Sequence, residues 1–253
     1  MLRQHITTIE ALIVRDLMVR FGRQDLGFVW AIIEPMILVS GVLGVWSLLH
    51  GSGINGVPVL SFIITGYMPL TVWRHTTSSM TRLLHNQAIL LYHRPITHFD
   101  LVFARLFLEL LAATTALLVV AFVLIAVGLM EPIDDWSLAL LGWTLTCAYF
   151  GGVGMVIAGM TQLWEKTEKF VQPVNYFALP VSGVFFMVDW LPSWAQHAVL
   201  WNPPVNCIEI LRAGFIGPDI ATHYNIGYTS FVTVAVLILG LSFVRSSRRY
   251  IEI

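Results

Sequence analysis

Four charged residues inside long apolar stretches are the residues of this sequence whose positions could support chemistry. Glu34 and Arg74 lie in two separate apolar stretches, and Arg105 and Glu109 share a third, four residues apart. If these stretches cross a membrane as helices, a rise of ~1.5 Å per residue places all four at a similar depth near one surface. Charges at such a depth are costly unless they are paired or hydrated. We therefore predict an intramembrane charge network in which Glu34 faces Arg74 and Arg105 pairs with Glu109 across one helical turn.

Two interpretations of this network are open. In the first, the pairs only fix the register of neighbouring helices. In the second, they line a polar vestibule at the inner surface for a hydrophilic, anionic substrate.

The sequence lacks the patterns of common catalytic and metal sites. A phosphate-binding loop needs Gly-Lys followed by Ser or Thr, but the two lysines of the chain, Lys166 and Lys169, each follow a glutamate. Neither His-Glu-x-x-His nor Gly-x-Ser-x-Gly occurs. Three histidines of one loop, His85, His93 and His98, lack the spacing of paired metal ligands. We therefore predict no enzyme activity, no metal and no cofactor in this chain, so that uphill transport would draw its energy from a partner or an ion gradient.

The composition of the chain is typical of membrane proteins with several helical spans. Hydrophobic residues make up 57% and charged residues 11%, against about 45–50% and about 25% in soluble domains. Stretches near the ~20 residues that a helix needs to cross a bilayer recur along the sequence. We predict an all-α polytopic membrane protein with one transmembrane domain over residues 1–253 and six transmembrane helices. The first five lie within residues 28–188, near 28–49, 58–80, 101–129, 137–163 and 173–188, and the sixth covers residues 228–245.

Small residues four apart in the fourth span predict close helix contacts. The pairs are Ala148 with Gly152 and Gly154 with Ala158. Such pairs let helix backbones approach one another within one subunit or across a dimer, and the sequence does not separate these two arrangements.

The distribution of basic residues predicts the orientation in the membrane. Residues 1–27 contain an amphipathic interface helix, because Ile6, Ile9, Ile13 and Leu17 recur at helical spacing. Arginines and lysines gather in this segment, in the loops after the second and fourth spans and at the C-terminus. Because such residues favour the cytoplasmic side, we expect both termini to be cytoplasmic, with a tail at 246–253.

Residues 189–227 are too long for a turn and too apolar for a solvated loop. Asn202, Pro203 and Pro204 divide the segment, and we predict two short amphipathic helices around that break, in a re-entrant hairpin at the non-cytoplasmic surface of the membrane. Glu209 and Arg212, three residues apart, can pair on the second helix. The hairpin is either a structural lid or a gate at the outer mouth of a pathway.

Three motifs occur in order along the chain. The first combines Arg15-Asp16, Arg20-Phe21-Gly22, Leu26-Gly27, Trp30 and Glu34-Pro35; the second is the loop from Leu90 to Arg105; the third is Asn202-Pro203 followed by Glu209 and Arg212. Together they resemble the membrane subunits of type-two ABC exporters, in particular the KpsM-like permeases of capsular polysaccharide export, and the match covers essentially the whole chain. The Arg-Asp pair that this family often carries after the fourth span is not evident here, where Trp-Glu-Lys-Thr-Glu-Lys-Phe stands instead.

The resemblance implies a permease in the cell inner membrane that moves lipid-linked capsular polysaccharide from cytoplasm to periplasm. It also implies a homodimer, two copies of an ABC ATPase subunit that carry the ATP and Mg, a periplasmic polysaccharide co-polymerase and an outer-membrane exporter. Nucleic acid is not among the expected partners. The ATPase would contact the N-terminal helix and the loop near residues 84–97. The resulting ATPase-coupling residues are Arg15, Arg20, Tyr92, His93, Arg94 and Pro95.

A conduit between two permease copies could offer aromatic rings that stack on sugars. The candidate residues are Tyr176, Phe177, Phe185, Phe186, Trp190 and Trp194. Core packing and anchoring at the membrane surface are the alternative roles for each of these rings.

Other functions stay open at this point. The same architecture could carry O-antigen or teichoic acid. A membrane-embedded glycan or lipid transferase would recruit Asp189, His197, Glu209 and His223, which show no catalytic spacing. An ion-coupled secondary transporter is disfavoured because no inverted repeat is visible.

Overall fold

The computed structural model describes residues 2–21, 37, 41, 44–45, 53–54, 56–87 and 96–247. The predicted first span at 28–49 with Glu34, the loop residues Tyr92 to Pro95 and most of the tail at 246–253 lie outside these ranges. The predictions about them therefore stay predictions.

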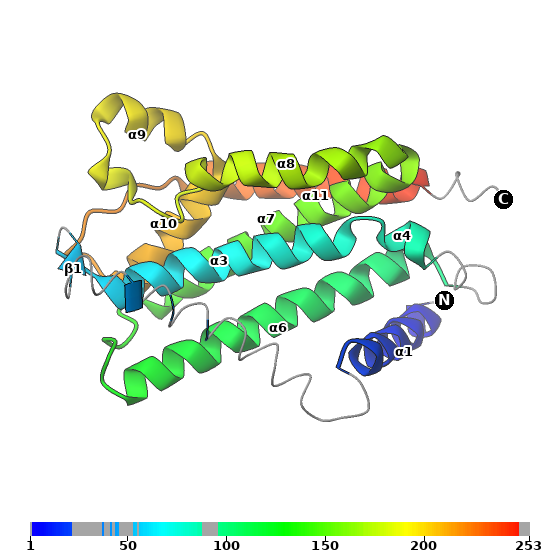
Figure 1. Ribbon diagram of the computed structural model, residues 1–253, viewed down its shortest axis with the longest axis horizontal. Helices are drawn as coiled ribbons and strands as arrows, with labels where there is room; N and C mark the ends of the chain where they lie inside the picture. Colours follow the sequence, from blue (N-terminus) through cyan, green and yellow to red (C-terminus); the bar gives the residue numbers. More distant parts are fainter. Residues whose placement is uncertain are drawn as a thin grey trace.

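Four long helices form the body of the molecule and run along its longest axis (Figure 1). They are α3 (Val59–Met80), α6 (His98–Ala126), α7 (Trp136–Leu163) and α11 (Ile226–Ser247). The N-terminal helix α1 (Leu2–Phe21) and the short α4 (Leu83–Asn86) lie at the end of the bundle where α6 begins.

Shorter elements complete the fold. Helix α8 (Glu168–Ala178) runs along one side of the bundle, between the 3₁₀ turns η1 (Glu165–Thr167) and η2 (Leu179–Val181). The far end carries η3 (Val188–Trp190), α9 (Ser193–Val199), α10 (Pro203–Ile216) and the antiparallel strands β1 (Gly53–Ile54) and β2 (Val57–Pro58). Apart from these two-residue strands, the regular structure of the described residues is helical, as the sequence predicts.

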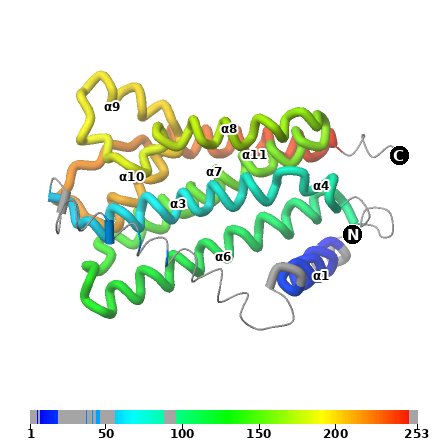
Figure 2. The backbone as a smooth tube through the Cα atoms, viewed as in Figure 1, coloured from blue at the N-terminus to red at the C-terminus, as the bar shows by residue number. Residues whose placement is uncertain are grey.

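Among the described residues, three helices are long and apolar enough to cross a membrane, namely α6, α7 and α11. They coincide with the predicted third, fourth and sixth spans. Helix α3 occupies the predicted second span but is not one of the three, because the polar run from Arg74 to Ser79 makes its second half less apolar. The start of α1 and the end of α11 lie at the same end of the bundle (Figure 2).

The predicted fifth span, 173–188, is wrong in its bounds. Helix α8 begins at Glu168 and the helical path ends at Val181, so the charged segment that was expected to be a loop is partly helical. The 3₁₀ turn η1 leads directly into α8, and Glu168 in the first turn suits the positive end of the helix dipole. Pro173 lies inside the helix instead of starting it.

The expectation that the second hairpin helix is amphipathic is also wrong. All residues of α10 from Pro204 to Phe215 are buried, because the helix packs against α7, α3 and α11. The predicted break holds, since Pro203 and Pro204 occupy the first helical turn, where the missing N–H groups would have no helical partner.

Helix α7 lies at the centre of the packing and contacts α3, α10 and α11. A Cβ atom on Gly159 would come within 2.6 Å of the backbone of Phe243 in α11, and one on Gly142 within 2.5 Å of the backbone of Leu211 in α10. The predicted Gly152 and Gly154 contacts are also within the subunit, against Val236 and Thr76. Close approach within one subunit therefore accounts for these small residues.

Candidate functional site

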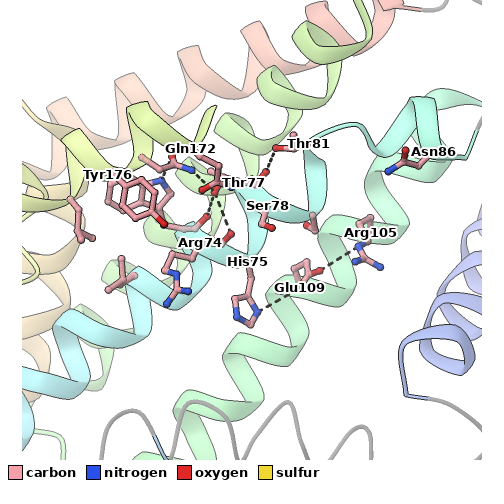
Figure 3. A pocket seen from close by; sticks show the side chains of 15 residues that line it. Arg74, His75, Thr77, Ser78, Thr81, Asn86, Arg105, Glu109, Gln172 and Tyr176 are labelled. Atoms are coloured by element: carbon pink, nitrogen blue, oxygen red, sulfur yellow. Dashed lines mark hydrogen bonds and ion pairs between the residues drawn. The ribbon is translucent and has the colours of Figure 1, made fainter. Parts of the chain in front are cut away.

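A cavity of about 750 Å³ lies between α3, α6 and α8, and Figure 3 shows its lining. It brings together residues that the sequence analysis treated separately, namely three members of the predicted charge network and one of the predicted aromatic residues. The lining comprises Leu70, Trp73, Arg74, His75, Thr77, Ser78, Ser79, Thr81, Asn86, Arg105, Glu109, Gln172, Asn175, Tyr176 and Leu179.

Hydrogen bonds between side chains fix the wall made by α3 and α8. Trp73 Nε1 donates to Asn175 Oδ1 at 3.1 Å, and Asn175 Nδ2 donates to Thr77 Oγ1 at 3.1 Å. The Thr77 hydroxyl in turn donates to the Trp73 carbonyl oxygen, and the Trp73 ring stacks on Phe150 of α7. Because each member is held by another, this side of the cavity is rigid and polar.

The opposite wall carries an ion-pair cluster on α6. The Nε atom of Arg105 lies 3.3 Å from Glu109 Oε1, within ion-pair distance across one helical turn. Glu109 is 1% exposed at its side chain, and His75 Nδ1 of α3 lies 3.8 Å from its Oε2. One buried carboxylate therefore connects two helices of the cavity wall.

Arg74 is exposed in the same cavity. None of the carboxylates in the described residues lies within ion-pair distance of it, and its predicted partner Glu34 lies outside them. The pair stays a prediction, tested by charge exchange. Glu34→Arg is expected to abolish folding or activity, and adding Arg74→Glu to restore it. Folding or activity that stays lost in the double variant would contradict direct pairing.

The N-terminal helix reaches this cluster through residues on its buried side. Asp16 is 7% exposed and accepts from Nε of Arg15 at 3.0 Å. Its Oδ2 lies 3.6 Å from Nη1 of Arg105. Arg15 also donates to Gln87 Oε1 at 2.9 Å. The family resemblance implies Arg15 as a coupling residue but not Asp16. The available signal for Asp16 was a carboxylate that lies off the apolar stripe of an interface helix.

The structure describes less of the other predicted coupling residues. Nothing is described of the Arg20 side chain or of Tyr92 to Pro95. The start of α6 after this loop is fixed by a capping box, in which Asp100 N donates to Thr97 Oγ1 and Thr97 N donates to Asp100 Oδ2. His5 of α1 lies 3.0 Å from Asp100, so α1 is attached to α6 at a second place.

A second cavity of about 500 Å³ adjoins the first and shares Ser78, Thr81, Asn86 and Gln172 with it. Arg82 and Glu168 line it and form an ion pair at 3.3 Å. The two cavities together form a polar hollow from Tyr176 to the end of the bundle where α4 lies.

The six predicted aromatic residues separate into different environments. Tyr176, Phe177, Phe185 and Trp194 are exposed, and Tyr176 also lines the cavity. Trp190 instead packs against Phe62, with ring centroids 5.1 Å apart, and Phe186 is half-buried. The exposed rings remain available to a ligand, a lipid or a second subunit, whereas Trp190 is partly buried and packs against the core.

Glu209 and Arg212 do pair, at 3.3 Å, with both side chains almost fully buried. Arg212 donates to the carbonyl oxygens of Phe186 and Val184, and its guanidinium lies 4.4 Å from the centroid of the Phe62 ring. Burial lowers the pKa of Arg212 to about 10 and raises that of Glu209 above its usual value, while their mutual attraction opposes both shifts. The pair thus fastens the turn before α9 to α10; its role as a gate stays a prediction.

Two of the four residues considered for a transferase come together. His223 Nε2 lies 3.2 Å from Asp189 Oδ1. Glu209 is occupied, because it accepts from Arg212 and from the backbone N–H groups of Val188 and His223. The described residues contain no cluster of His, Cys, Asp and Glu that could hold a metal ion.

Comparison with known proteins identifies relatives over nearly the full length. A family model described as ABC-2 type transporter matches residues 7–216. The capsule polysaccharide export inner-membrane protein CtrC of Neisseria meningitidis is 32% identical over 244 residues, covering 96% of this chain and 92% of the relative. BexB of Haemophilus influenzae, which bears the same description, is 29% identical over the same shares. The polysialic acid transport protein KpsM of Escherichia coli is 24% identical, covering 94% and 93%.

Proposed function

This chain belongs to the ABC-2 type transporter family, and we propose that it is the inner-membrane permease subunit of an exporter for capsular polysaccharide. The observation that carries the proposal is the match to CtrC, a capsule polysaccharide export protein, over 96% of this chain. Three apolar helices of membrane-crossing length and a polar cavity beside them support it.

The finer parts of the proposal concern assembly. The chain has six spans with both termini cytoplasmic. It forms a homodimer, because a single bundle of this size is too thin to enclose a pathway for a polymer. Two copies of an ABC ATPase subunit bind at the end of the bundle that carries α1 and α4, and ATP and Mg belong to that partner. A periplasmic polysaccharide co-polymerase and an outer-membrane exporter continue the path of the lipid-linked polymer.

The cavity between α3, α6 and α8 serves as the inner vestibule of this pathway. Arg74 is exposed in it, and an exposed guanidinium suits an anionic sugar or phosphate group. The exposed ring of Tyr176, which lines the cavity, offers an apolar face to sugar rings. Polar residues along the wall supply hydrogen-bonding groups that can exchange partners as the polymer advances.

Co-purification tests the proposed partnership. When the chain is expressed with an ABC ATPase subunit from the same organism, the two proteins should purify together in detergent, and ATP hydrolysis should be measurable in the complex but not with the permease alone. A permease that purifies without any ATPase and splits ATP unaided would contradict the proposal.

A further inference from the structure

Asp16 is the point where the N-terminal helix meets the wall of the cavity. Its carboxylate contacts Arg15 of its own helix and Arg105 of α6. Arg105 also contacts Glu109, and Glu109 contacts His75. A continuous line of ionisable groups therefore runs from α1 through α6 to α3 and ends at residues that line the cavity.

Burial of the Asp16 carboxylate costs free energy unless its charged partners stay in contact with it. Asp16 is 7% exposed, and a buried carboxylate is stable only with charged or hydrogen-bonding partners. Arg15 moves together with Asp16 because the two are neighbours in one helix. Arg105 belongs to another helix, so the attraction between Asp16 and Arg105 acts between α1 and the cavity wall.

Two other polar contacts of α1 do not reach the cavity. His5 contacts Asp100, which caps the start of α6, and Arg15 contacts Gln87, which follows α4. Neither Asp100 nor Gln87 lines the cavity. Asp16 therefore differs from His5 and Arg15 in acting on a side chain of the cavity itself.

Arg105 is shared between two carboxylates on different helices. Its Nη1 atom faces Asp16 at 3.6 Å and its Nε atom faces Glu109 at 3.3 Å. The guanidinium position thus depends on where α1 lies. If α1 moves away, Arg105 keeps only the attraction of Glu109, and its guanidinium shifts toward Glu109. This shift changes the distribution of charge on the cavity wall.

We propose that Asp16 is a positioning residue of the transport cycle, which couples movement of α1 to the charge in the cavity by holding Arg105. This inference rests on the proposed function, because it assigns α1 to the side where the ATPase binds. Asp16 itself does not contact the substrate. Its effect is transmitted through Arg105, so the quantity that depends on it is the amount of polymer exported per ATP hydrolysed.

The test uses the permease and its ATPase reconstituted together in proteoliposomes. Asp16→Asn keeps the shape of the side chain and removes its charge. We expect the polymer exported per ATP hydrolysed to fall about tenfold, within the usual range of coupling between sites, while the rate of ATP hydrolysis changes little. Asp16→Glu, which retains the charge, should keep most of the ratio. His5→Gln is the matched control, because it alters an attachment of α1 that does not reach the cavity, and it should leave the ratio unchanged.

A double variant tests the route through Arg105. If Asp16 acts through Arg105, Asp16→Asn combined with Arg105→Gln should lose no more of the ratio than Arg105→Gln alone. Should Asp16→Asn fail to assemble, Arg105→Gln alone must show the loss. A normal ratio in the assembled single variants, or additive losses in the double variant, overturns the inference. Wild-type complex that hydrolyses ATP without exporting polymer would instead contradict the proposed function, so the two failures are distinguishable.

Discussion

Arg212→Met is expected to leave little folded protein in the membrane. The guanidinium is fully buried, pairs with Glu209 and donates to two backbone carbonyl oxygens of the turn before α9. Removing it leaves an uncompensated buried carboxylate, and breaking a buried pair in this way typically costs about 3–5 kcal/mol. Thermal unfolding in detergent, together with the amount of protein in the membrane fraction, measures the effect.

Two variants show whether the buried charge is the cause. Replacing both residues by Met removes the stranded carboxylate, and the double variant should be more stable than Arg212→Met alone. Arg82→Ala breaks the exposed pair with Glu168 and should change stability by no more than about 1 kcal/mol. If the single and double variants lose the same stability, the shape of the two side chains, and not their charge, stabilises the packing around α10.

Gly159→Ala is expected to separate α7 from α11. The added Cβ atom would lie 2.6 Å from both the backbone carbon and the Cβ of Phe243, and a backbone can give way only if the whole helix moves. Overpacking of this kind typically costs about 1–3 kcal/mol. Unfolding in detergent, compared with the wild-type protein, checks the prediction.

The matched control lies in the same helix. A Cβ atom on Gly151 would meet only the end of the Leu110 side chain, at 3.8 Å, which is ordinary van der Waals contact. Gly151→Ala should therefore be as stable as the wild-type protein or slightly more stable, since alanine favours helix. If Gly159→Ala and Gly151→Ala have the same unfolding temperature, the close contact of α7 with α11 is not the reason that Gly159 must be glycine.

The long apolar helices could be predicted from sequence because length and composition alone determine them. The predicted bounds of α6, α7 and α11 differ from the observed ones by at most three residues. The Arg105–Glu109 pair was predictable for a similar reason, because a spacing of four residues brings two side chains together on any helix.

The features that sequence reasoning missed depend on tertiary contacts. Asp16 reaches Arg105 only because α1 packs beside α6, and no local spacing indicates that. The burial of α10 on every side follows from its place between α7, α3 and α11. For α8, the span was predicted to begin at residue 173, but the helix begins at Glu168 and runs through Pro173. Trp190 was a candidate either for a conduit or for core packing, and its contact with Phe62 is equally invisible in the sequence.

The location of polymer in cells that lack this chain tests the central claim most directly. Cells in which its gene is deleted and restored on a plasmid would be fractionated, and polysaccharide measured at the surface and in the cytoplasm. An export permease predicts that surface polymer disappears, that full-length polymer accumulates in the cytoplasm, and that the plasmid reverses both. Loss of polymer from both compartments would contradict the account and indicate a role in synthesis.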